Sequence, residues 1–448
     1  MFNPYYKNVK TQYEINKLAF GTQMELMNSN LITSIVPPFP SMADKRNKRG
    51  AENYKRYISL GNYISNPAIS FDSSIGITNK EPATVKLPEN MQDIIYYATK
   101  EGTDIQTIQN QIMKDIFMYG GSLLEVSIPE GISIADNLPK LKVHSIADLL
   151  DYSTFKNEKV FADLLDYSSF KNEKVFDEFK WLVFDSSDYM FDESSKNYNY
   201  VKMLTIHGLN SSGVYYIAKI FYNDYQTFNF SSPEVSRCIS YYEPSWNTQL
   251  DFIPFVAINK LDCTVKYDTS FVQDLINLSL ENYRLSCNLG WLEQAASSSH
   301  LVIKGKNLDG DVNDYPIGAT AVHLLRDDTA QEYYVTPSTA GMAEIKEHIQ
   351  QNNELISNMQ YSLLNASANS SGEALQFRIA VKVTDLIGLV KNIGKAITLS
   401  LEYIDEIINA GVNKDSIEYL PYLDFDKVSS FLGNESEEED KPQENLEN

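Results

Sequence analysis

Two short motifs in the sequence contain residue types that bind phosphate or metal ions in other proteins. The run Gly388–Ala396 has the glycines and the lysine of a phosphate-binding loop. It has five residues between its glycines where that loop has four, and Ala396 stands where Ser or Thr would reach Mg²⁺. The run also lies within a helical pattern of apolar residues. The sequence therefore predicts a plain helix here.

The second motif is the acidic run Asp309–Asp314, which has the alternating oxygen ligands of a calcium-binding loop. Asp314 occupies the position of the glycine that makes the sharp turn of such a loop, and Thr320 replaces the bidentate acid at its twelfth position. These two departures favour a tight polar turn.

The histidines and cysteines show no pattern of a catalytic or metal site. Metal ligands and nucleophiles need fixed short spacings, such as those of Gly-x-Ser-x-Gly, and none is present. An odd number of cysteines without paired spacing predicts free thiols. The residues concerned are His144, His207, His300, His323, His348, Cys238, Cys263 and Cys287. We therefore predict no enzymatic activity, no cofactor and no metal ion.

The charge of the chain argues against a protein that grips duplex DNA. The formal net charge is −22, whereas affinity for nucleic acid comes largely from Lys and Arg that neutralise phosphates. Residues 270–365 contain twelve acids and five bases, a net charge of about −7. Two interpretations stay open: the acids form solvated helix faces, or they create a field that repels phosphates.

One basic cluster and one acidic tail stand out from this background. The cluster contains Lys45, Arg46, Lys48, Arg49, Lys55 and Arg56, diluted by Asp44 and Glu52. It is interpreted as a solvated or subunit-interface face, with a nucleic-acid footprint as the alternative. Residues 433–448 carry seven acids and one Lys, which is the composition of a disordered, solvated tail.

The spacing of apolar residues predicts the elements that must position these charges. Residues 270–300 have leucines at three- and four-residue steps and no proline, which predicts a single helix of roughly 45 Å. Short apolar stretches at Leu301–Ile303 and Ala321–Leu325, separated by the turn-rich Gly305–Gly318, predict a small strand unit. Helical spacing resumes over Ala343–Leu364.

The polar segment Asn365–Gly372 breaks the helical pattern, because Ser and Asn compete for backbone hydrogen bonds and Gly loses the most freedom on ordering. A third helix follows, with the most continuous apolar stripe in the chain. Its members are Leu375, Ile379, Val383, Leu386, Val390, Ile393, Ile397, Leu401, Ile404 and Ile408.

The upstream half predicts strands as well as helices. A helix is expected over Thr103–Met118, and a strand over Ser122–Pro129 after Gly120-Gly121. Residues 199–270 are rich in Tyr, Phe, Ile and Val between turn signals, which predicts an antiparallel sheet. Residues 147–161 are repeated at 162–176 with one difference, Thr154 against Ser169. We interpret this as a recent duplication in a surface strand or hairpin, and expect an α+β fold.

The order helix, strand unit, helix, polar break, helix, with Ser371-Gly372-Glu373-Ala374-Leu375 opening the last helix, resembles the portal proteins of tailed bacteriophages. The upstream residues Tyr54-Lys55-Arg56-Tyr57, Tyr63, Asn66, Gly76, Pro82 and Leu87-Pro88 are similar to the opening of the shorter portal-like phage proteins. The resemblance covers residues 50–410.

The resemblance implies a portal-like α+β fold and a homo-oligomeric ring, usually of twelve subunits, at one capsid vertex of the virion. Residues 1–268 would be a mixed α/β wing, 269–300 and 340–364 a two-helix stem, and 301–339 a small β-containing clip. Residues 365–372 would be a tunnel loop, 373–432 a crown-side helical region and 433–448 the tail. The ring would conduct double-stranded DNA non-specifically during packaging and ejection.

The implied partners are the major capsid protein, the large subunit of the terminase during packaging, and a head-tail adaptor at the clip. The implied site residues fall into four groups. They are tunnel-loop residues Asn365, Ser367, Asn369, Ser370, Ser371 and Gly372; stem-packing residues Leu275, Leu278, Leu285 and Leu289; channel acids Asp274, Glu281, Glu293, Glu347 and Glu354; and clip residues Lys304, Lys306, Asp309 and Asp311.

An alternative function stays open, in which the chain is another phage structural or interaction protein that shares only the helical C-terminal half. No stretch approaches the roughly 18 apolar residues that span a bilayer, and the first residues lack a secretory pattern. The sequence therefore predicts no membrane association, and the resemblance implies the host cytoplasm as the place of assembly.

Overall fold

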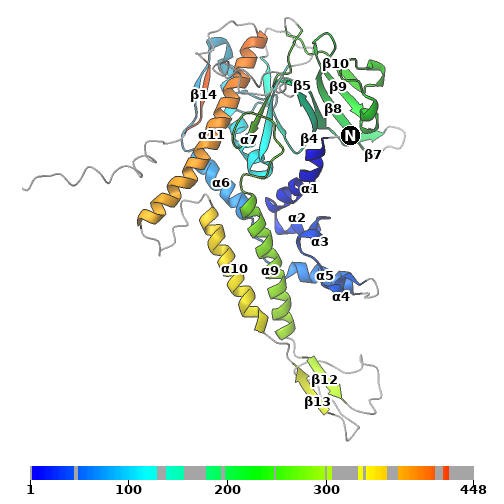
Figure 1. The fold of residues 1–448 in the computed structure, drawn as a ribbon, viewed down its shortest axis with the longest axis vertical. Helices are drawn as coiled ribbons and strands as arrows, with labels where there is room; N and C mark the ends of the chain where they lie inside the picture. The colour runs from blue at the N-terminus through cyan, green and yellow to red at the C-terminus, as the bar shows by residue number, and fades with distance from the viewer. Residues whose placement is uncertain are drawn as a thin grey trace, which may run out of the picture. The chain divides into compact units, whose positions relative to one another are not determined.

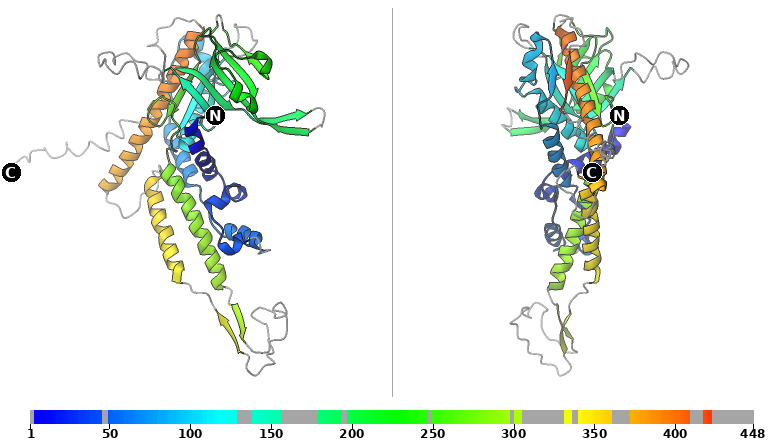
Figure 2. Two further views of the ribbon diagram at one scale, coloured as in Figure 1. Left: turned by 45° about the vertical axis from the view of Figure 1, so that its right-hand side comes forward. Right: turned by 90° about the vertical axis from the view of Figure 1, so that its left-hand side faces the viewer.

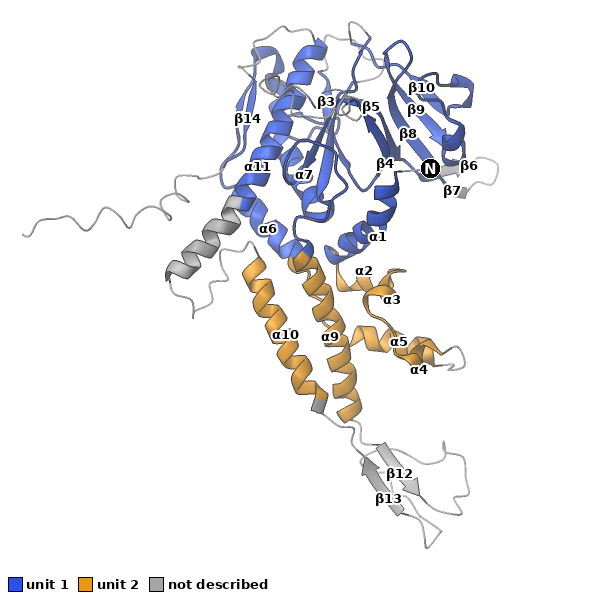
Figure 3. Cartoon of the chain, in the orientation of Figure 1, with its two compact units in different colours: residues 1–20, 67–273, 361–448 blue, residues 21–66, 274–360 orange. Residues whose placement is uncertain are grey.

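The computed structural model groups the chain into two compact units, each built from separated stretches of sequence (Figure 3). Unit 1 contains residues 1–20, 67–273 and 361–448, and unit 2 contains residues 21–66 and 274–360. The structure describes residues 3–44, 49–128, 138–155, 178–192, 197–246, 249–297, 300–304, 331–335, 340–360, 372–408 and 417–422.

Two antiparallel sheets form the centre of unit 1 (Figure 1). The five-stranded sheet has the order β10-β9-β8-β5-β4 and the three-stranded sheet the order β11-β2-β3. The five strands are β10 (Ser240–Tyr242), β9 (Tyr215–Phe221), β8 (Met203–Leu209), β5 (Phe179–Asp185) and β4 (Leu149–Thr154). The three strands are β11 (Phe255–Asn259), β2 (Gly121–Ser127) and β3 (Lys140–Ser145). The predicted antiparallel sheet within 199–270 is confirmed for β8, β9 and β10.

Helix α7 (Ile105–Tyr119) packs on β2 and β3. It begins at Asp104, whose carboxylate accepts a hydrogen bond from Thr107 N at 2.7 Å, a typical N-cap. It ends at Gly120, whose φ of 81° is the left-handed conformation that glycine adopts without cost. The predicted helix over Thr103–Met118 and the strand after it are therefore confirmed within two residues.

Helix α11 (Gly372–Ile408) contacts β11, β2 and α7. The predicted apolar stripe is buried from Leu386 to Ile404. The motif Gly388–Ala396 lies inside this helix, so the prediction of a plain helix there is confirmed. Gly394 packs closely against Pro421. A Cβ at this position would lie 2.6 Å from Cδ of the proline ring, so the packing requires glycine.

The remaining elements of unit 1 surround these sheets. They are α1 (Pro4–Ala19), α6 (Asn66–Thr78), the 3₁₀ helices η1 (Glu89–Ile95), η2 (Tyr222–Thr227) and η3 (Val235–Arg237), the strand pair β1 (Thr84–Lys86) with β14 (Glu418–Leu420), and the hairpin β6 (Asp188–Asp192) with β7 (Asn197–Val201). Figure 2 shows the hairpin β6–β7 extending away from the five-stranded sheet. Helices and strands are thus both present in quantity, and the predicted α+β class holds.

Unit 2 is built mainly of helices. It contains α2 (Gln23–Asn28), α3 (Ile32–Ile35), α4 (Pro40–Ala43), α5 (Gly50–Ser59), α9 (Gln273–Ser297) from its second residue, and α10 (Ala340–Met359). Between α9 and α10 the chain forms the antiparallel hairpin β12 (His300–Lys304) with β13 (Gln331–Val335). The first predicted strand, Leu301–Ile303, is present. Its partner is Gln331–Val335, a strand that we had not predicted, and the expected strand Ala321–Leu325 lies outside the described residues.

The unit boundaries differ from the domains expected from the sequence. Residues 21–66, expected in the wing, group with the helix pair because α5 packs on α9. The first copy of the tandem repeat forms β4, paired with β5, whereas the second copy, the acidic run Asp309–Asp314 and the acidic tail lie outside the described residues.

Candidate functional site: the helix pair and the segment that leads into it

The most buried face of α9 packs against residues 57–66 of unit 2. Tyr283 Oη donates a hydrogen bond to Ile58 O at 2.8 Å, and Cys287 Sγ lies 3.7 Å from the same oxygen. Gly290 allows close approach, since a Cβ there would lie 2.9 Å from Leu60 O. Burial raises the pKa of the Cys287 thiol to about 12. The thiol is therefore a packing group, not a reactive one.

Sequence reasoning missed this face. Its buried members, Ser279, Tyr283 and Cys287, are small or polar and fall outside the leucine pattern. Tyr57 Oη also donates to Asn288 Oδ1 at 2.6 Å, and its ring meets Trp291 edge-on, with centroids 6.1 Å apart. The available signal was the Ser-x-x-x-Tyr-x-x-x-Cys-x-x-Gly spacing, which places residues of modest size along one helix face.

The leucines expected to pack in the stem lie mainly on the other side of α9. Leu278, Leu285 and Leu289 are half-buried, and they share a face with Asn282 at three- and four-residue steps. Asn282 Nδ2 donates to Asn353 Oδ1 of α10 at 2.9 Å. The leucine face is therefore the one turned toward α10. Leu275, near the start of the helix, is fully buried.

Helix α10 packs against the leucine face of α9 through a single stripe of residues. Asn352, Ile356 and Gln360 are buried. Two side-chain contacts join the helices. They are the ion pair of Lys346 Nζ with Glu293 Oε1 at 2.9 Å, and the contact of His348 Nε2 with Glu281 Oε1 at 3.9 Å, which is an ion pair only when the histidine is protonated. The paired numbers run in opposite directions, so the two helices are antiparallel. The Lys346–Glu293 ion pair is solvent-exposed and contributes about 1 kcal/mol or less.

The predicted channel acids fall into two groups. Glu281 and Glu293 are paired with bases, Glu281 also with Arg284 at 3.5 Å. The others, Asp274, Glu347 and Glu354, are exposed, and none has a basic partner within the described part of the chain. Together α9 and α10 contain six carboxylates and two bases, a net charge of −4. The helix pair is therefore an acidic surface.

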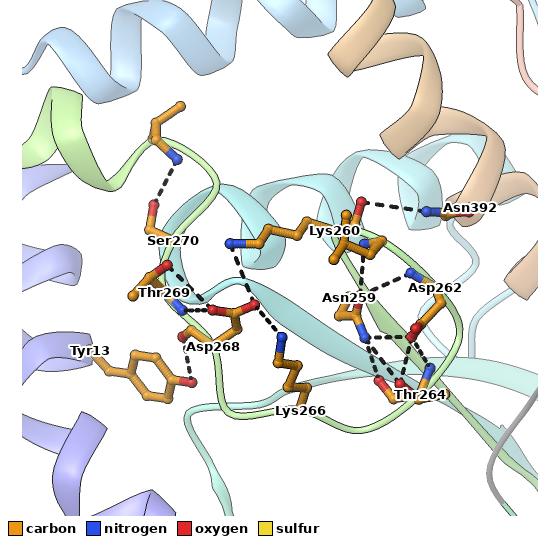
Figure 4. Close-up of polar contacts among 12 residues, drawn as sticks. Tyr13, Asn259, Lys260, Asp262, Thr264, Lys266, Asp268, Thr269, Ser270 and Asn392 are labelled. Atoms are coloured by element: carbon orange, nitrogen blue, oxygen red, sulfur yellow. Dashed lines mark hydrogen bonds and ion pairs between the residues drawn. The ribbon is translucent and has the colours of Figure 1, made fainter.

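The segment 259–272 of unit 1 connects β11 to α9 and is held by side chains (Figure 4). Asn259 accepts hydrogen bonds from the backbone N–H of Leu261 at 2.7 Å and of Asp262 at 2.9 Å. Its amide also donates to Asp262 Oδ1 at 2.7 Å. From α11, Asn392 donates to Lys260 O at 3.4 Å. The loop is thus fixed at its beginning to the sheet and to a buried helix.

Asp268 fixes the second half of this segment. Its Oδ2 lies 3.4 Å from Lys260 Nζ and 3.3 Å from Lys266 Nζ, and its Oδ1 accepts from Thr269 N at 2.7 Å. Burial by itself raises the pKa of Asp268, but the backbone hydrogen bond and the two lysines lower it below the usual range. Tyr13 of α1 donates to Asp268 O at 3.2 Å. The carboxylate therefore stays charged and holds the turn.

The start of α9 is anchored within unit 1. Ser270 Oγ donates to Phe117 O at the end of α7, and Phe271 N donates to Ile116 O at 3.1 Å. Asn16 and Gln273 exchange two amide hydrogen bonds, at 2.9 and 3.2 Å. The first residue of α9 is thus bound to α1, while the rest of the helix belongs to unit 2.

A buried polar chain in unit 1 is the other cluster with catalytic residue types. Glu125 Oε2 lies 2.6 Å from His144 Nε2, and His207 Nδ1 lies 2.7 Å from Tyr215 Oη. The two imidazole centroids are 6.3 Å apart, with Phe184 and Phe255 packed on both.

Burial determines the pKa values of the side chains in this buried polar cluster. Desolvation lowers the pKa of His207 to about 4. For Glu125, burial raises the pKa, but the His144 hydrogen bond and the nearby positive groups outweigh it and lower the pKa to about 2. Both side chains are almost inaccessible to solvent. This cluster of polar side chains therefore joins the two sheets and is not placed to receive a substrate.

The predicted tunnel-loop and clip residues fall mostly outside the described residues. This applies to Asn365, Ser367, Asn369, Ser370, Ser371, Lys306, Asp309 and Asp311. Gly372 is expected at the end of the loop, but in the structure it is the first residue of α11. Lys304 is the last residue of β12.

The described residues contain neither a cluster of metal ligands nor a membrane-spanning helix. In this part of the chain, no group of three His, Cys, Asp or Glu side chains is arranged to hold a metal ion. None of the described helices is long and apolar enough to cross a membrane.

Comparisons with known proteins gave a distant structural likeness. No protein-family model matches the chain, and no curated protein matches it. Among solved structures, it is similar to a chain described as the neck of the native GTA particle computed with C12 symmetry. The identity is 11%, the TM-score is 0.34, and the match covers 84% of this chain and 85% of that one. A TM-score this low does not establish a shared fold.

Proposed function

We propose that this chain is the subunit of a portal ring, which forms the DNA conduit at one vertex of a tailed-phage capsid. The observation that carries the proposal is the antiparallel pair α9 and α10, whose connection is the hairpin β12–β13. A helix pair with a strand hairpin at its turn, followed by the long helix α11 with its buried stripe from Leu386 to Ile404, is the element order expected for stem, clip and crown-side helix.

The surface of the helix pair supports oligomerisation. Helix α10 is covered on one face only, and its other positions are exposed, including Leu355 and Met359. A helix of 20 residues with one narrow covered stripe gains little from packing within one chain. Contacts with further copies would cover the rest, as a closed ring requires.

The charge of the helix pair supports a conduit and not a DNA-gripping protein. A net charge of −4 on α9 and α10 would be repeated by every subunit of a ring. Such a field repels phosphates, so that duplex DNA slides without being bound. Capsid protein, terminase and a head-tail adaptor would bind elsewhere on the ring, the adaptor at the hairpin β12–β13.

The first test is the mass of the purified full-length chain, measured by mass photometry and imaged by negative-stain electron microscopy. Rings of about twelve subunits with a central hole are expected. A monomer or dimer at micromolar concentration would contradict the proposal and favour a phage structural protein that shares only the helical C-terminal half.

The second test addresses conduction of DNA. Deleting Ser367–Ser370 should leave ring formation unchanged and lower the DNA packaged per particle, because this segment would act on the passing duplex. A matched control replaces Ser367, Asn369 and Ser370 by alanines, which keeps the length of the segment. Normal DNA content after the deletion would contradict the tunnel-loop role, and failed ring formation would assign the segment a structural one.

A further inference from the structure

We propose that neighbouring copies in the ring join through opposite charges, with the exposed face of α10 of one copy docked on the exposed face of α5 of the next. The partner is therefore a second copy of this chain. This inference rests on the proposed ring and goes beyond it by naming the two surfaces that meet. It assigns Glu347 and Glu354 to the contact between copies and not to the channel wall, so the acids left for the channel would be Asp274, Glu281 and Glu293.

The face of α10 that points away from α9 is acidic. Glu347 and Glu354 lie on the side of the helix opposite the buried Asn352 and Ile356, as their spacing requires, and the exposed Glu344 lies at the edge of that side. None of the three has a cationic partner among the residues that the structure describes. Their contacts are with neutral amides, Gln351 to Glu347 at 3.3 Å and Gln350 to Glu354 at 3.4 Å.

This acidic face also contains an apolar side chain. Leu355 is 46% exposed and lies one position after Glu354. An exposed leucine on a helix surface gains free energy when a partner covers it. The face therefore combines a charged rim with an apolar contact, which is the composition of a protein–protein interface.

The exposed face of α5 has the opposite sign. Lys55 and Arg56 are exposed, whereas Tyr57 and Ile58 are buried against α9. Glu52 shares the exposed face and removes one charge from it, and the exposed Arg49 adds one at its beginning. The net charge of the four residues is +2, which complements the acids of α10.

The geometry of unit 2 favours pairing between copies over pairing within one copy. Helix α9 lies between α10 and α5, with Asn282 contacting α10 and Tyr283 contacting the end of α5 (Figure 3). The acidic face of a chain therefore points away from its own basic face. Two acidic faces would repel each other, so a two-fold symmetric contact is disfavoured. A contact between unlike faces is heterologous and generates a ring when its rotation closes.

A reciprocal charge reversal tests the pairing. One variant carries Glu347→Lys and Glu354→Lys, a second carries Lys55→Glu and Arg56→Glu, and a third carries all four substitutions. Ring formation by the full-length chain is measured by mass photometry across protein concentrations in 150 mM salt. Each two-residue variant should lower the association constant about tenfold or more, and the four-residue variant should restore it.

A matched control separates this effect from a change of net charge. Lys7→Glu with Lys10→Glu alters two exposed bases of α1 by the same amount and should leave the rings intact. Rings that form equally well in both reversed variants would overturn the inference while leaving the proposed ring standing. Disruption by each variant without recovery in the four-residue variant would also overturn it, because the faces would then bind something other than each other.

Cysteine cross-linking gives a second measurement that does not depend on assembly strength. Glu347→Cys and Arg56→Cys in one chain should form disulfides between copies on mild oxidation, giving a ladder of covalent oligomers on a denaturing gel. The single variants should give no ladder. If wild-type rings form and the double-cysteine rings stay monomeric on the gel, the two faces do not meet.

Discussion

His207 and Tyr215 share a hydrogen bond inside the five-stranded sheet, with 2.7 Å between Nδ1 and Oη. Burial lowers the pKa of His207 to about 4, against about 6.5 in an unfolded chain. The folded protein therefore keeps this imidazole neutral under conditions in which the unfolded chain binds a proton. The hydrogen bond is made by the neutral ring.

We predict that His207 makes unit 1 labile to acid. Because the folded pKa is lowered, the stabilisation is complete above about pH 6.5 and is lost as the pH falls toward 4, by up to about 3 kcal/mol. The His207→Gln variant, which cannot titrate, should lose less stability between these pH values. Urea melts of both proteins at pH 7.5 and pH 4.5 measure the difference.

The comparison with the variant is needed because other groups titrate in the same range. Burial raises the pKa of Asp115 to about 7, so this carboxyl contributes stability at low pH that is lost as the pH rises toward 7. The lowered pKa of Glu125, about 2, acts mainly below pH 4.5. An equal pH dependence in wild type and His207→Gln would contradict the assignment to His207.

Gly120 should tolerate no side chain. Its φ is 81°, and a Cβ would collide with Thr269 O in the segment that leads into α9. Gly120→Ala should therefore lower the stability by about 3 kcal/mol or more, combining backbone strain and overpacking. Gly213→Ala is the matched control, since its φ is 75° and nothing lies within 4 Å of the added atom. It should cost about 1 kcal/mol. Similar melting curves for the two variants would contradict the collision.

The buried side chain of Asn352 should destabilise the packing of α10 on α9. Its side chain is 4% exposed, and its Nδ2 has no hydrogen-bond partner among the described residues. Asn352→Leu should raise the urea midpoint, because the substitution removes an unsatisfied buried donor. The free energy of unfolding should increase by about 1 kcal/mol. Asn353→Leu, which breaks the bond to Asn282, should lower it. A lower midpoint for Asn352→Leu would mean that the amide has a partner in the assembled protein.

Deleting Ala162–Phe176 should leave folding and assembly intact, because a duplicated surface segment adds chain length at small entropic cost. Thermal melting and ring formation are the measurements. A chain with these fifteen residues replaced by a Gly/Ser sequence of equal length separates the effect of length from that of packing. A fall in Tm of more than about 10 °C, well over 1 kcal/mol for a chain of this size, would show that both copies are packed.

Local patterns predicted the helices better than the contacts between them. Helix α11 was found from its continuous apolar stripe, because a helix buried in a core needs one. The face of α9 that packs on α5 was missed, because Ser279 and Cys287 are not apolar markers and their partner Ile58 lies more than 200 residues away. Similarly, the spacing of His144 and His207 in the sequence gives no sign that they lie together. Only the strand order brings their rings to 6.3 Å.

The contact between α5 and α9 joins segments that are far apart in the sequence, and this has a consequence for synthesis on the ribosome. Tyr57 finds its partner Asn288 only after 231 further residues, which at 5–20 residues per second takes roughly 10 to 50 s. During that interval the aromatic and aliphatic side chains of α5 have left the exit tunnel without the helix that covers them. A nascent chain therefore exposes an apolar surface for much of its translation. Pausing, chaperone binding or premature contact between nascent chains would act on this surface before any complete subunit exists.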